Sequence, residues 1–599
     1  MDDVAEKIEL IDIQLAKAIS KRGELNRLIA RLKQEKDELQ SNYNLKKSLD
    51  IDDNWTKTNF PWSKELQNNL EKTFHLKSFR SQQICAINAT LSNKDVLLLM
   101  PTGGGKTLCY QLPALIGKGM TLVISPLLAL MEDQLIKLKK LGINSISMSS
   151  GTPKEIKNQG FQYLSKGVGN PIKFMYVTPE WLAKSKKFMS GLQKLHEAKK
   201  LDRIAIDEVH CCSQWGHDFR PDYKYLGLLK GMFSDVPIIG LTATATTSVL
   251  LDIQNMLDIP GCAIIRAPFD RPNLKFKVVA KPDKSEECLS LLEKLLTKKY
   301  KDECGIIYTA TIKDCEEVTK GLMARGLKVK HYHAELPDER RTKTHNSWLK
   351  DDVRVIVATV AFGMGIDKAD VRFVVHYSVP KSMETLYQES GRAGRDGKNA
   401  ECVVMFKLSD YLKNSGYARS KTEIKNALSV LEYCLDKRNC RHYLIGLHFE
   451  ESKIKSCNTM CDNCDNKSTL ETYDIKEACS DVYQILEHAA IAENNLTANK
   501  LIDLWMKPKI KIKKPNISKE EAEYLVGHLI LKGCLREEKS YTPYSVNCYL
   551  RKSHSTSQIE VVLNASASLD NYLKRKRKVI EIDDSEDETN SKSKSKKSK

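Results

Sequence analysis

A glycine-rich turn beside a lysine and a threonine is the strongest chemical signal in the sequence. Residues 100–107 read MPTGGGKT and follow an apolar run, 95–99, that has the composition of a buried strand. Glycines let backbone N–H groups approach a phosphate closely, and the helix expected after Thr107 favours negative charge at its N-terminus. Lys106 would reach the β- and γ-phosphates, and the Thr107 hydroxyl would ligate Mg²⁺. The strict pattern has glycine where Met100 stands, so a glycine-rich turn with a chance GKT is the alternative.

An acidic pair offers the second part of such a site. Asp207 and Glu208 follow the apolar run Ile204–Ile206, and such a position suits the end of a strand. Two adjacent carboxylates allow a division of labour, in which Asp207 holds Mg²⁺ and Glu208 orients and deprotonates the attacking water. An acidic pair alone is often a solvated loop, but its place downstream of the GKT favours the chemical interpretation.

Four cysteines have the spacing of a metal site. Cys440, Cys457, Cys461 and Cys464 are separated by sixteen, three and two residues. A tetrahedral thiolate site needs four sulfurs in one place, and a tight pair such as Cys461 and Cys464 supplies half of that geometry locally. We therefore expect a structural zinc site, the alternative being unlinked buried cysteines.

Two tandem α/β regions must position these residues. Apolar runs alternate with amphipathic helical stretches over residues 65–275 and again over 276–415, which predicts an α/β fold class with two parallel sheets and a cleft between them. The expected strands are Asp95–Met100, Thr121–Ser125, Phe174–Val177, Arg203–Ile206, Ile238–Leu241, Gly305–Tyr308, Val353–Ala358, Phe373–Tyr377 and Cys402–Phe406.

The remaining regions flank this pair. Residues 1–45 repeat apolar side chains at threes and fours, which predicts a helix that either self-associates as a coiled coil or packs on the body. A linker is expected at 46–64, a helical zinc-binding module at 416–470, and short helices ending in a β-hairpin at 471–555. Residues 556–599 are rich in Ser, Lys, Glu and Asp and are expected to form a disordered tail.

Composition bounds the class of protein. At 599 residues the chain is too long for one core, and it has no apolar run near the ~20 residues of a membrane span and no secretory signal, so no membrane partner is expected. An odd count of 17 cysteines favours a reducing compartment. The net charge of +18 favours a polyanionic partner such as nucleic acid, although basic stretches at 574–578 and 591–599 supply much of it.

With these motifs in hand, the sequence resembles the superfamily-two helicases, and more narrowly the RecQ-type DNA helicases. The spelling DEVH at 207–210, the run CSQWGHDFRP at 212–221 and LTATA at 241–245 match that family in order. FGMGIDK at 362–368 and QESGRAGRDG at 388–397 match its last two motifs, and the cysteine spacing matches its zinc module. The resemblance covers roughly residues 60–550. The chain most resembles the short members of the family, which lack a further helical HRDC domain.

The resemblance implies roles for the nucleotide site. The two α/β regions would be RecA-like lobes that bind ATP between them, with Gln388, Arg392 and Arg395 facing the nucleotide from the second lobe. An arginine in this position contributes ~10³–10⁵ in rate where it has been measured. The residues expected to contact the nucleotide from the first lobe are Phe79, Arg80 and Gln83 of an adenine-reading motif and Thr102, Gly103, Gly104, Gly105, Lys106 and Thr107 of the turn.

The resemblance also implies DNA contacts. Trp215, Phe219 and Arg220 lie in the loop that couples DNA binding to hydrolysis in the family, and Tyr223 is a further aromatic that either stacks on bases or packs in the core. Residues 471–555 would form a winged helix. Its hairpin, with strands at Cys534–Lys539 and Val546–Leu550, would carry Tyr544 at the tip, with Tyr541 in reserve, either to separate strands or as a surface residue.

The tail and the N-terminal helix point to partners. The basic run 574–578 fits a nuclear-localisation signal, so a nuclear protein is expected. An apolar run followed by acids at 579–588 resembles a SUMO-interacting motif that adds a strand to a partner's sheet edge. The N-terminal helix makes a homo-oligomer the favoured state.

The resulting expectation is an ATP- and Mg²⁺-dependent DNA helicase that carries zinc and binds single-stranded and duplex DNA. The resemblance implies movement 3′→5′ and a role in DNA repair, replication or recombination. The alternatives are a DNA-stimulated translocase with little unwinding, or a strand-annealing or architectural DNA-binding protein with an inactive ATPase. Intact Lys106, Asp207, Glu208, Arg392 and Arg395 argue against the last.

Overall fold

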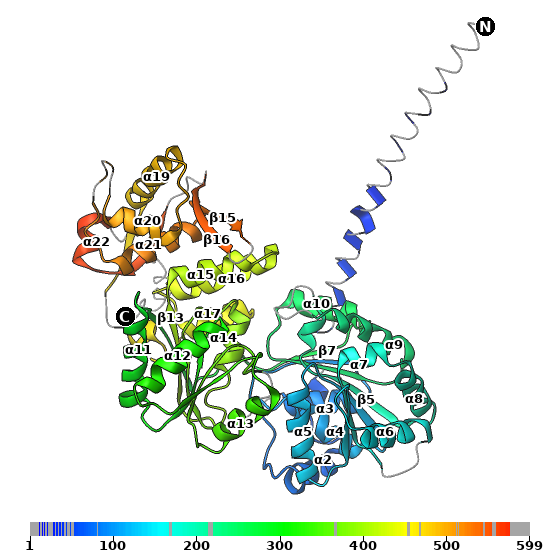
Figure 1. The fold of residues 1–599 in the computed structure, drawn as a ribbon. Coiled ribbons are helices and arrows are strands. Elements are labelled where there is room, and N and C mark those ends of the chain that lie inside the picture. The colour runs from blue at the N-terminus through cyan, green and yellow to red at the C-terminus, as the bar shows by residue number, and fades with distance from the viewer. Residues whose placement is uncertain are drawn as a thin grey trace, which may run out of the picture. The chain divides into compact units, whose positions relative to one another are not determined.

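A computed structural model describes the chain from residue 53 to residue 575, and Figure 1 shows its fold. Within that range it leaves out 81, 167–170, 214–219, 364–367, 452–455, 467–468, 509, 511, 513, 543–545 and 554–558, and before it only scattered positions from 11 to 48 are described. The chain forms two compact units. Residues 1–434 and 439–465 make the first, and residues 435–438 and 466–599 make the second.

The first unit begins with a seven-stranded sheet whose neighbouring strands all run parallel, in the order β3-β4-β2-β5-β6-β1-β7. Its strands are β1 (Val96–Leu99), β2 (Met120–Ile124), β3 (Ser145–Met148), β4 (Phe174–Val177), β5 (Leu201–Ile206), β6 (Ile238–Thr242) and β7 (Ala263–Arg266). The central strands are buried at every residue, since helices cover both faces of a parallel sheet.

Helices cover this sheet and complete the first lobe. They are α2 (Ser63–Lys72), α3 (Gln83–Leu91), α4 (Leu108–Ile116), α5 (Leu128–Lys140), α6 (Lys154–Lys166), α7 (Pro179–Lys184), α8 (Lys186–Glu197), α9 (Gly227–Met232) and α10 (Thr247–Met256), with short helical turns η1 (Asp53–Thr56), η2 (Val209–Cys212) and η3 (Pro221–Leu226). One apolar core joins α2, α3 and α4 to β1 and β6 and extends to Ile265 of β7.

A second parallel sheet has six strands in the order β10-β11-β9-β12-β13-β8. Its strands are β8 (Leu274–Ala280), β9 (Cys304–Tyr308), β10 (Val329–Tyr332), β11 (Val355–Ala358), β12 (Val371–His376) and β13 (Ala400–Phe406), with helices α11 (Ser285–Lys294), η4 (Leu295–Lys299), α12 (Ile312–Ala324), α13 (Asp338–Leu349) and α14 (Met383–Ser390). The expectation of two parallel-sheet lobes is confirmed.

A helical module follows within the first unit and packs on the edge strand β8. It contains α15 (Leu408–Tyr417), α16 (Lys421–Leu435), α17 (Arg441–His448) and α18 (Asp462–Asp465). The backbone N–H of Phe276 donates to the carbonyl of Met460 at 3.2 Å, and that of Val278 donates to Asp462 at 3.0 Å. The cysteine-bearing segment is therefore attached to the second lobe through main-chain N–H groups of β8.

The described part of the second unit combines four helices with two small sheets. Its elements are β14 (Leu470–Asp474), α19 (Lys476–Ile491), α20 (Ala498–Met506), α21 (Lys519–Leu531), β15 (Leu535–Tyr541), β16 (Val546–Lys552), β17 (Glu560–Asn564), α22 (Ala567–Tyr572) and β18 (Lys574–Arg575). Strands β15 and β16 form an antiparallel hairpin in which Tyr541 pairs with Val546. Tyr541 therefore lies at the end of a strand and not in the loop where the sequence placed it.

Two expected boundaries are wrong. Residues 46–64 are not a free linker, because the indole N–H of Trp62 donates to the side chain of the buried Asn88 at 2.9 Å and Asn88 donates to the Trp55 carbonyl at 2.8 Å. The tail does not begin at 556, because β17 pairs with β14 and the Tyr572 hydroxyl bonds to Asp481. Polar composition concealed two apolar segments that pack in the second unit, 559–563 and 569–573.

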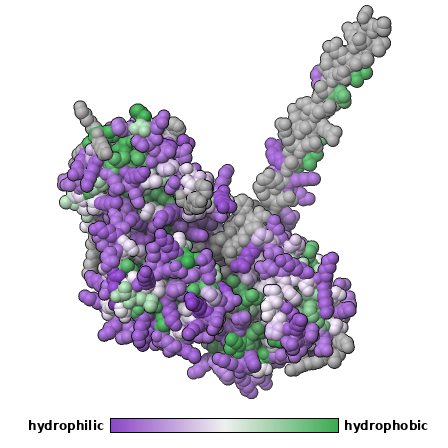
Figure 2. All heavy atoms as spheres, in the orientation of Figure 1, coloured by the Kyte–Doolittle hydropathy of each residue, from purple (hydrophilic) through white to green (hydrophobic). Residues whose placement is uncertain are grey.

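The described positions among residues 11–44 are helical and expose apolar side chains, which Figure 2 shows in green along this segment. Those exposed by 40% or more include Ile11, Leu15, Leu25, Leu28, Ile29, Leu32 and Leu39. None of the helices that the structure describes has the length and apolar composition needed to cross a membrane. The expected acidic and basic tail beyond residue 575 lies outside the described residues.

Candidate functional site

The glycine-rich turn joins the end of β1 to the start of α4, as the sequence predicts. Gly103 and Gly105 have φ angles of +79° and +91°, which side chains other than glycine rarely adopt. Gly104 is required for a different reason, because a Cβ there would lie 2.5 Å from Cγ of Met100. Met100 is buried, so the residue that departs from the strict pattern fills the space that Gly104 leaves and supports the turn from the core.

Residues of the expected adenine-reading motif brace this turn. The Gln83 amide donates to the carbonyl of Gly105 at 3.1 Å, and its oxygen accepts from the backbone N–H of Arg80 at 2.7 Å. The Arg80 guanidinium bonds to the carbonyl of Gly103. Phe79 packs against the core of the first lobe. This motif lies against the phosphate turn, and Gln83 is buried while Arg80 remains exposed.

Lys106 and the acidic pair form one electrostatic cluster. The Lys106 ammonium donates to the Met100 carbonyl at 3.0 Å. Burial lowers the pKa of Lys106, and the Glu208 and Asp207 carboxylates act against that shift. Burial, followed by the charge of Glu208, raises the pKa of Asp207 to about 7, while Lys106 acts in the opposite direction. The turn and the acidic pair therefore share one site, whose carboxylate and hydroxyl oxygens are the ligands that Mg²⁺ prefers.

Glu208 stands in a strained backbone position that aims its carboxylate. Its φ of +48° places it in the left-handed region, which is uncommon for a non-glycine residue. Its carboxylate lies 3.4 Å from Nδ1 of the buried His210, and that nitrogen lies 2.9 Å from the Thr242 hydroxyl. Because Thr242 ends β6 and is the second residue of the LTATA segment, a direct chain of contacts runs from the acidic pair to that segment. The spacing of these residues in the sequence does not indicate these contacts.

The two arginines of the second lobe have different positions. A Cβ on Gly103 would lie 2.9 Å from Cγ of Arg395, so the stem of Arg395 rests against the phosphate turn. Its charge also acts on Lys106. Arg392 is buried and bonds to the Gly363 carbonyl within the second lobe. Gln388 lies half-buried on α14. Of the expected trio, Arg395 is the residue that reaches the turn.

A third arginine, for which the sequence gives no signal, bridges the lobes. The Arg271 guanidinium donates to the carbonyl of Thr102 in the phosphate turn at 3.0 Å. It also donates to carbonyls in the motif that carries the two arginines, at 2.9 Å to Gly394 and 3.1 Å to Ala393. Arg271 lies between β7 and β8, where the chain passes from one sheet to the other. An isolated arginine in a connecting segment carries no spacing signal.

The four expected zinc ligands come together. The sulfur atoms of Cys440, Cys457, Cys461 and Cys464 all lie within 4.8 Å of one another. Tetrahedral coordination at Zn–S distances of about 2.3 Å places sulfurs about 3.8 Å apart, so the cluster fits zinc. The Cys440 thiol, and after it the backbone N–H groups of Arg441 and Cys464, hydrogen-bond to Cys461 and lower the pKa of its thiol. Cys434, Cys211 and Cys212 lie elsewhere and are buried.

The expected DNA-contacting residues are only partly described. Trp215, Phe219 and Tyr544 lie outside the described residues. Arg220 is half-buried, and its guanidinium donates to the Pro126 carbonyl at 3.3 Å. The idea that Tyr223 stacks on bases is wrong, because its side chain is fully buried and its hydroxyl donates to the Asp207 carbonyl at 3.3 Å.

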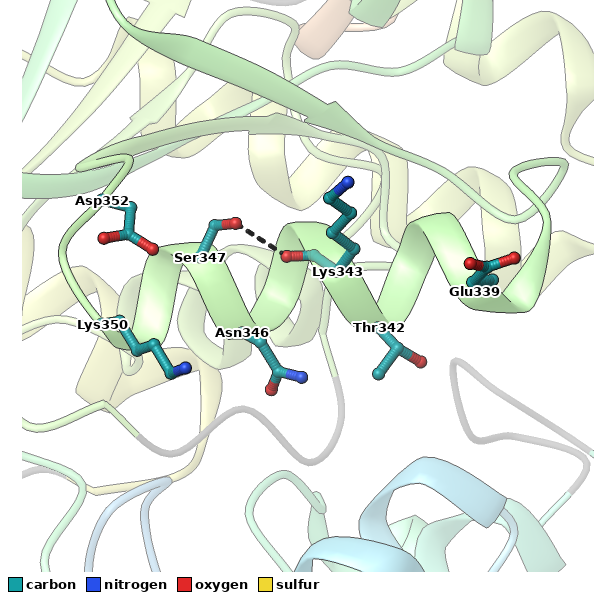
Figure 3. Close-up of a pocket in the computed structure, with 7 residues that line it drawn as sticks. All are labelled: Glu339, Thr342, Lys343, Asn346, Ser347, Lys350 and Asp352. Carbon is teal, nitrogen blue, oxygen red and sulfur yellow. Dashed lines mark hydrogen bonds between the residues drawn. The ribbon is translucent and has the colours of Figure 1, made fainter.

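A surface pocket of about 500 Å³ lies elsewhere, along α13 of the second lobe. Figure 3 shows its polar lining, with Thr342, Asn346 and Lys350 on one side of the helix, and Ser347 bonded to the main chain of Lys343. The charges of two lysines are balanced by Glu339 and Asp352. The pocket therefore lacks the net positive charge that a phosphate-binding site needs. None of its residues was expected in the nucleotide site.

Three family models match consecutive parts of the chain. The DEAD/DEAH box helicase model matches residues 80–253, the helicase conserved C-terminal domain matches 287–397, and the RecQ zinc-binding model matches 404–465. The first two matches fall on the two parallel-sheet lobes. The third falls on the module that gathers the four cysteines.

Full-length relatives agree with these matches. "ATP-dependent DNA helicase Q1" of Mus musculus is 41% identical over 97% of this chain and 93% of its own length. "ATP-dependent DNA helicase Q1" of Pongo abelii is 46% identical over 83% of this chain and 78% of its own. "Putative ATP-dependent DNA helicase Q1" of Caenorhabditis briggsae is 46% identical over 83% and 81% respectively. Together with the two parallel-sheet lobes and the four-cysteine cluster, these likenesses show that the chain belongs to the RecQ family of ATP-dependent DNA helicases.

Proposed function

We propose that this helicase hydrolyses ATP to move 3′→5′ along single-stranded DNA and unwinds the duplex ahead of it in DNA repair, replication or recombination. The ATP-driven part of the proposal rests on one observation: Arg395 of the second lobe and Arg271 of the connecting segment both contact the phosphate turn of the first lobe. A nucleotide in that turn is then held from both lobes, so that its binding and hydrolysis change the closure of the pair. The polarity rests on the family resemblance.

Each residue of the nucleotide site has a distinct task in this proposal. Thr107 and Asp207 hold Mg²⁺, which neutralises charge on the phosphates when it is bound. Lys106 binds the β- and γ-phosphates, and Glu208 orients the attacking water and accepts its proton. Arg395 stabilises the charge that develops on the γ-phosphate, and Arg392 supports the same motif from within the second lobe. Phe79, Arg80 and Gln83 position the adenine beside the turn.

His210 and Thr242 connect this chemistry to movement. Their contact at 2.9 Å joins the acidic pair to the segment after β6. Hydrolysis alters the charge beside Glu208, and the histidine is positioned to pass that change to LTATA. The loop that holds Trp215 and Phe219 follows the same acidic pair in the chain, and we propose that its aromatics stack on bases, with Arg220 close by.

The hairpin of the second unit is the proposed strand separator of a winged helix. Helices α19, α20 and α21 precede the hairpin β15–β16, which is the order of elements that a winged helix needs. The Tyr483 hydroxyl of α19 donates to the carbonyls of Cys534 at 2.8 Å and Ser553 at 3.1 Å and so fixes the base of the hairpin. Tyr541 is 65% exposed at its far end. Tyr544 follows three residues later in the chain and is the proposed stacking residue, with Tyr541 in reserve.

Strand displacement on tailed substrates tests this function. We expect ATP-dependent unwinding of duplexes with a 3′ tail and of forks, and none of duplexes that are blunt or carry only a 5′ tail. Glu208→Gln should bind DNA but not unwind it, because the proton acceptor is lost. Tyr544→Ala should keep DNA-stimulated ATPase and lose unwinding.

Four results would contradict the proposal. Unwinding of the 5′-tailed duplex alone would reverse the polarity. ATP hydrolysis without displacement on any substrate would favour a translocase, and annealing alone would favour a DNA-binding protein without a motor. Full unwinding by Glu208→Gln would remove the assigned proton acceptor.

Further partners belong to the same proposal. We propose zinc as a structural ion at the four cysteines and a nuclear location directed by residues 574–578. Residues 579–588 are proposed to bind SUMO or a SUMO-modified protein, which titration of a peptide spanning 574–590 tests directly. We also propose that the N-terminal helix mediates self-association.

A further inference from the structure

A second group of metal-binding side chains lies in the second lobe, apart from the cysteines and the nucleotide site. His331 is on β10, at the edge of the sheet, and His333 follows the end of that strand. Residues two apart on a strand point to the same side. Helix α12 packs against β10 and carries Glu316. An edge strand and its covering helix thus bring two imidazoles and a carboxylate together.

The distances within this group fit coordination of one ion. One ligand atom from each of Glu316, His331 and His333 lies within 4.8 Å of the others. The closest pair, Nε2 of His333 and Oε1 of Glu316, is 3.3 Å apart. Metal–ligand bonds of about 2.0–2.1 Å place tetrahedral ligands about 3.3 Å from one another. The imidazole rings are nearly parallel, with centroids 5.4 Å apart, and the exposed Glu316 is free to adjust its rotamer toward His331.

The hydrogen bonding of His333 is an independent sign of a ligand. Its side chain is 4% exposed, and neither ring nitrogen makes a hydrogen bond to any residue that the structure describes. Buried ring nitrogens normally have a partner, and a missing ion is one of the ordinary reasons for an orphan. Glu316 lies close to Nε2 but does not meet hydrogen-bond geometry, so the carboxylate stands beside the ring as a second ligand would.

We propose that Glu316, His331 and His333 bind a divalent transition ion of the zinc type, separate from the four-cysteine site. Two imidazoles and one carboxylate suit zinc, nickel or copper, whereas magnesium and calcium prefer oxygen ligands alone. Three protein ligands leave one coordination position for water, so binding is expected to be reversible. The ion would fasten α12 to β10. The simpler alternative is a packed histidine pair without a metal.

Metal counting on the full-length, zinc-loaded protein tests the proposal. After equilibrium dialysis against micromolar zinc, mass spectrometry should find one more ion per chain in the wild type than in Glu316→Gln or His331→Phe. Glu316→Gln keeps the size of an exposed side chain, and His331→Phe keeps the ring stack, so both are expected to fold. His488→Ala, which removes an exposed histidine of α19, should keep the wild-type count.

Cobalt absorbance gives a second readout. The wild type is prepared with zinc at the four cysteines only. Co²⁺ added to this protein should produce weak visible bands without the intense charge-transfer band of thiolate ligation. Both site variants should lack these bands. Equal metal counts in the wild type and the two variants would overturn the proposal. So would a cobalt spectrum with thiolate character, because the extra ion would then be at the cysteines.

Discussion

Asp207 combines partial burial with a carboxylate neighbour, and this combination predicts how the nucleotide site depends on pH. Burial and Glu208 raise the pKa of Asp207 to about 7, whereas Lys106 lowers it. A protonated Asp207 cannot act as a metal ligand, so Mg²⁺ must compete with a proton for this side chain. The protonated fraction is large below the raised pKa and falls as the pH passes above it.

We therefore predict that kcat/KM for ATP rises with pH through about 7 at low Mg²⁺. The expected midpoint moves to lower pH as Mg²⁺ is raised, because the ion displaces the proton. Steady-state ATPase with saturating DNA, measured from pH 5.5 to 8.5 at several Mg²⁺ concentrations, checks this. A midpoint that stays fixed at every Mg²⁺ concentration would show that another group titrates.

The sequence predicted most site residues but not their partners. Lys106, Asp207 and the four cysteines stand in short local patterns, so the sequence could propose roles for them from spacing. The contact of His210 with Thr242 and the contacts of Arg271 join residues far apart in the chain, and a single sequence contains no record of such pairs. For the same reason the sequence grouped Arg392 with Arg395, although only Arg395 reaches the phosphate turn.

At the scale of elements, the segment between β7 and β8 holds the two lobes together through Arg271. We predict that Arg271→Ala lowers DNA-stimulated ATP turnover by about tenfold to a hundredfold, since a hydrogen bond from a charged group contributes about 1.5–3 kcal/mol. Asn273→Ala is the matched control, because that amide donates to the carbonyls of Gly394 and Lys398, both in the second lobe. Equal losses in the two variants would mean that Arg271 acts on the second lobe alone.

The cysteine module gives a separate prediction. Cys461→Ala should release zinc, lower the melting temperature and leave α17 and α18 open to proteolysis, because a closed thiolate site contributes directly to folding. Cys434→Ala removes another buried cysteine and should keep the zinc content of the wild type. Zinc retained at the wild-type level in Cys461→Ala would contradict the assignment of the site.

Most strands with continuous apolar runs were predictable, although β7, which reads AIIR, was not among the expected strands. β4 has the bounds expected from Phe174–Val177, and β1 and β9 differ from expectation only at their ends. β10 reads VKHY and is an edge strand, so it lacks the apolar signal of a strand buried on both faces. β8 was missed because polar residues alternate with apolar ones in its first half. β17 was missed because the sequence around it is polar.

At the scale of the whole molecule, the N-terminal helix exposes an apolar stripe with no cover among the described residues. Leu25 and Leu32 are seven residues apart, as a coiled-coil seam requires, and are 59% and 51% exposed. We predict that replacing both with Asp shifts the protein from an oligomer to a monomer in light scattering. Lys33→Asp, which changes charge off this seam, should leave the mass unchanged. A wild-type protein that is already monomeric at micromolar concentration would contradict the prediction.

The central claim is that both lobes hold one nucleotide, with Arg395 acting across from the phosphate turn. Its most direct test is single-turnover ATP hydrolysis by Arg395→Ala with saturating single-stranded DNA, beside Arg341→Ala, which removes a surface arginine of α13. We predict that Arg395→Ala loses about 10³-fold in the hydrolysis rate while its affinity for nucleotide changes little. Arg341→Ala should match the wild type. If the hydrolysis rate of Arg395→Ala stays within about twofold of the wild-type rate, the proposed role of Arg395 is contradicted, because loss of an arginine finger lowers the rate about 10³-fold or more.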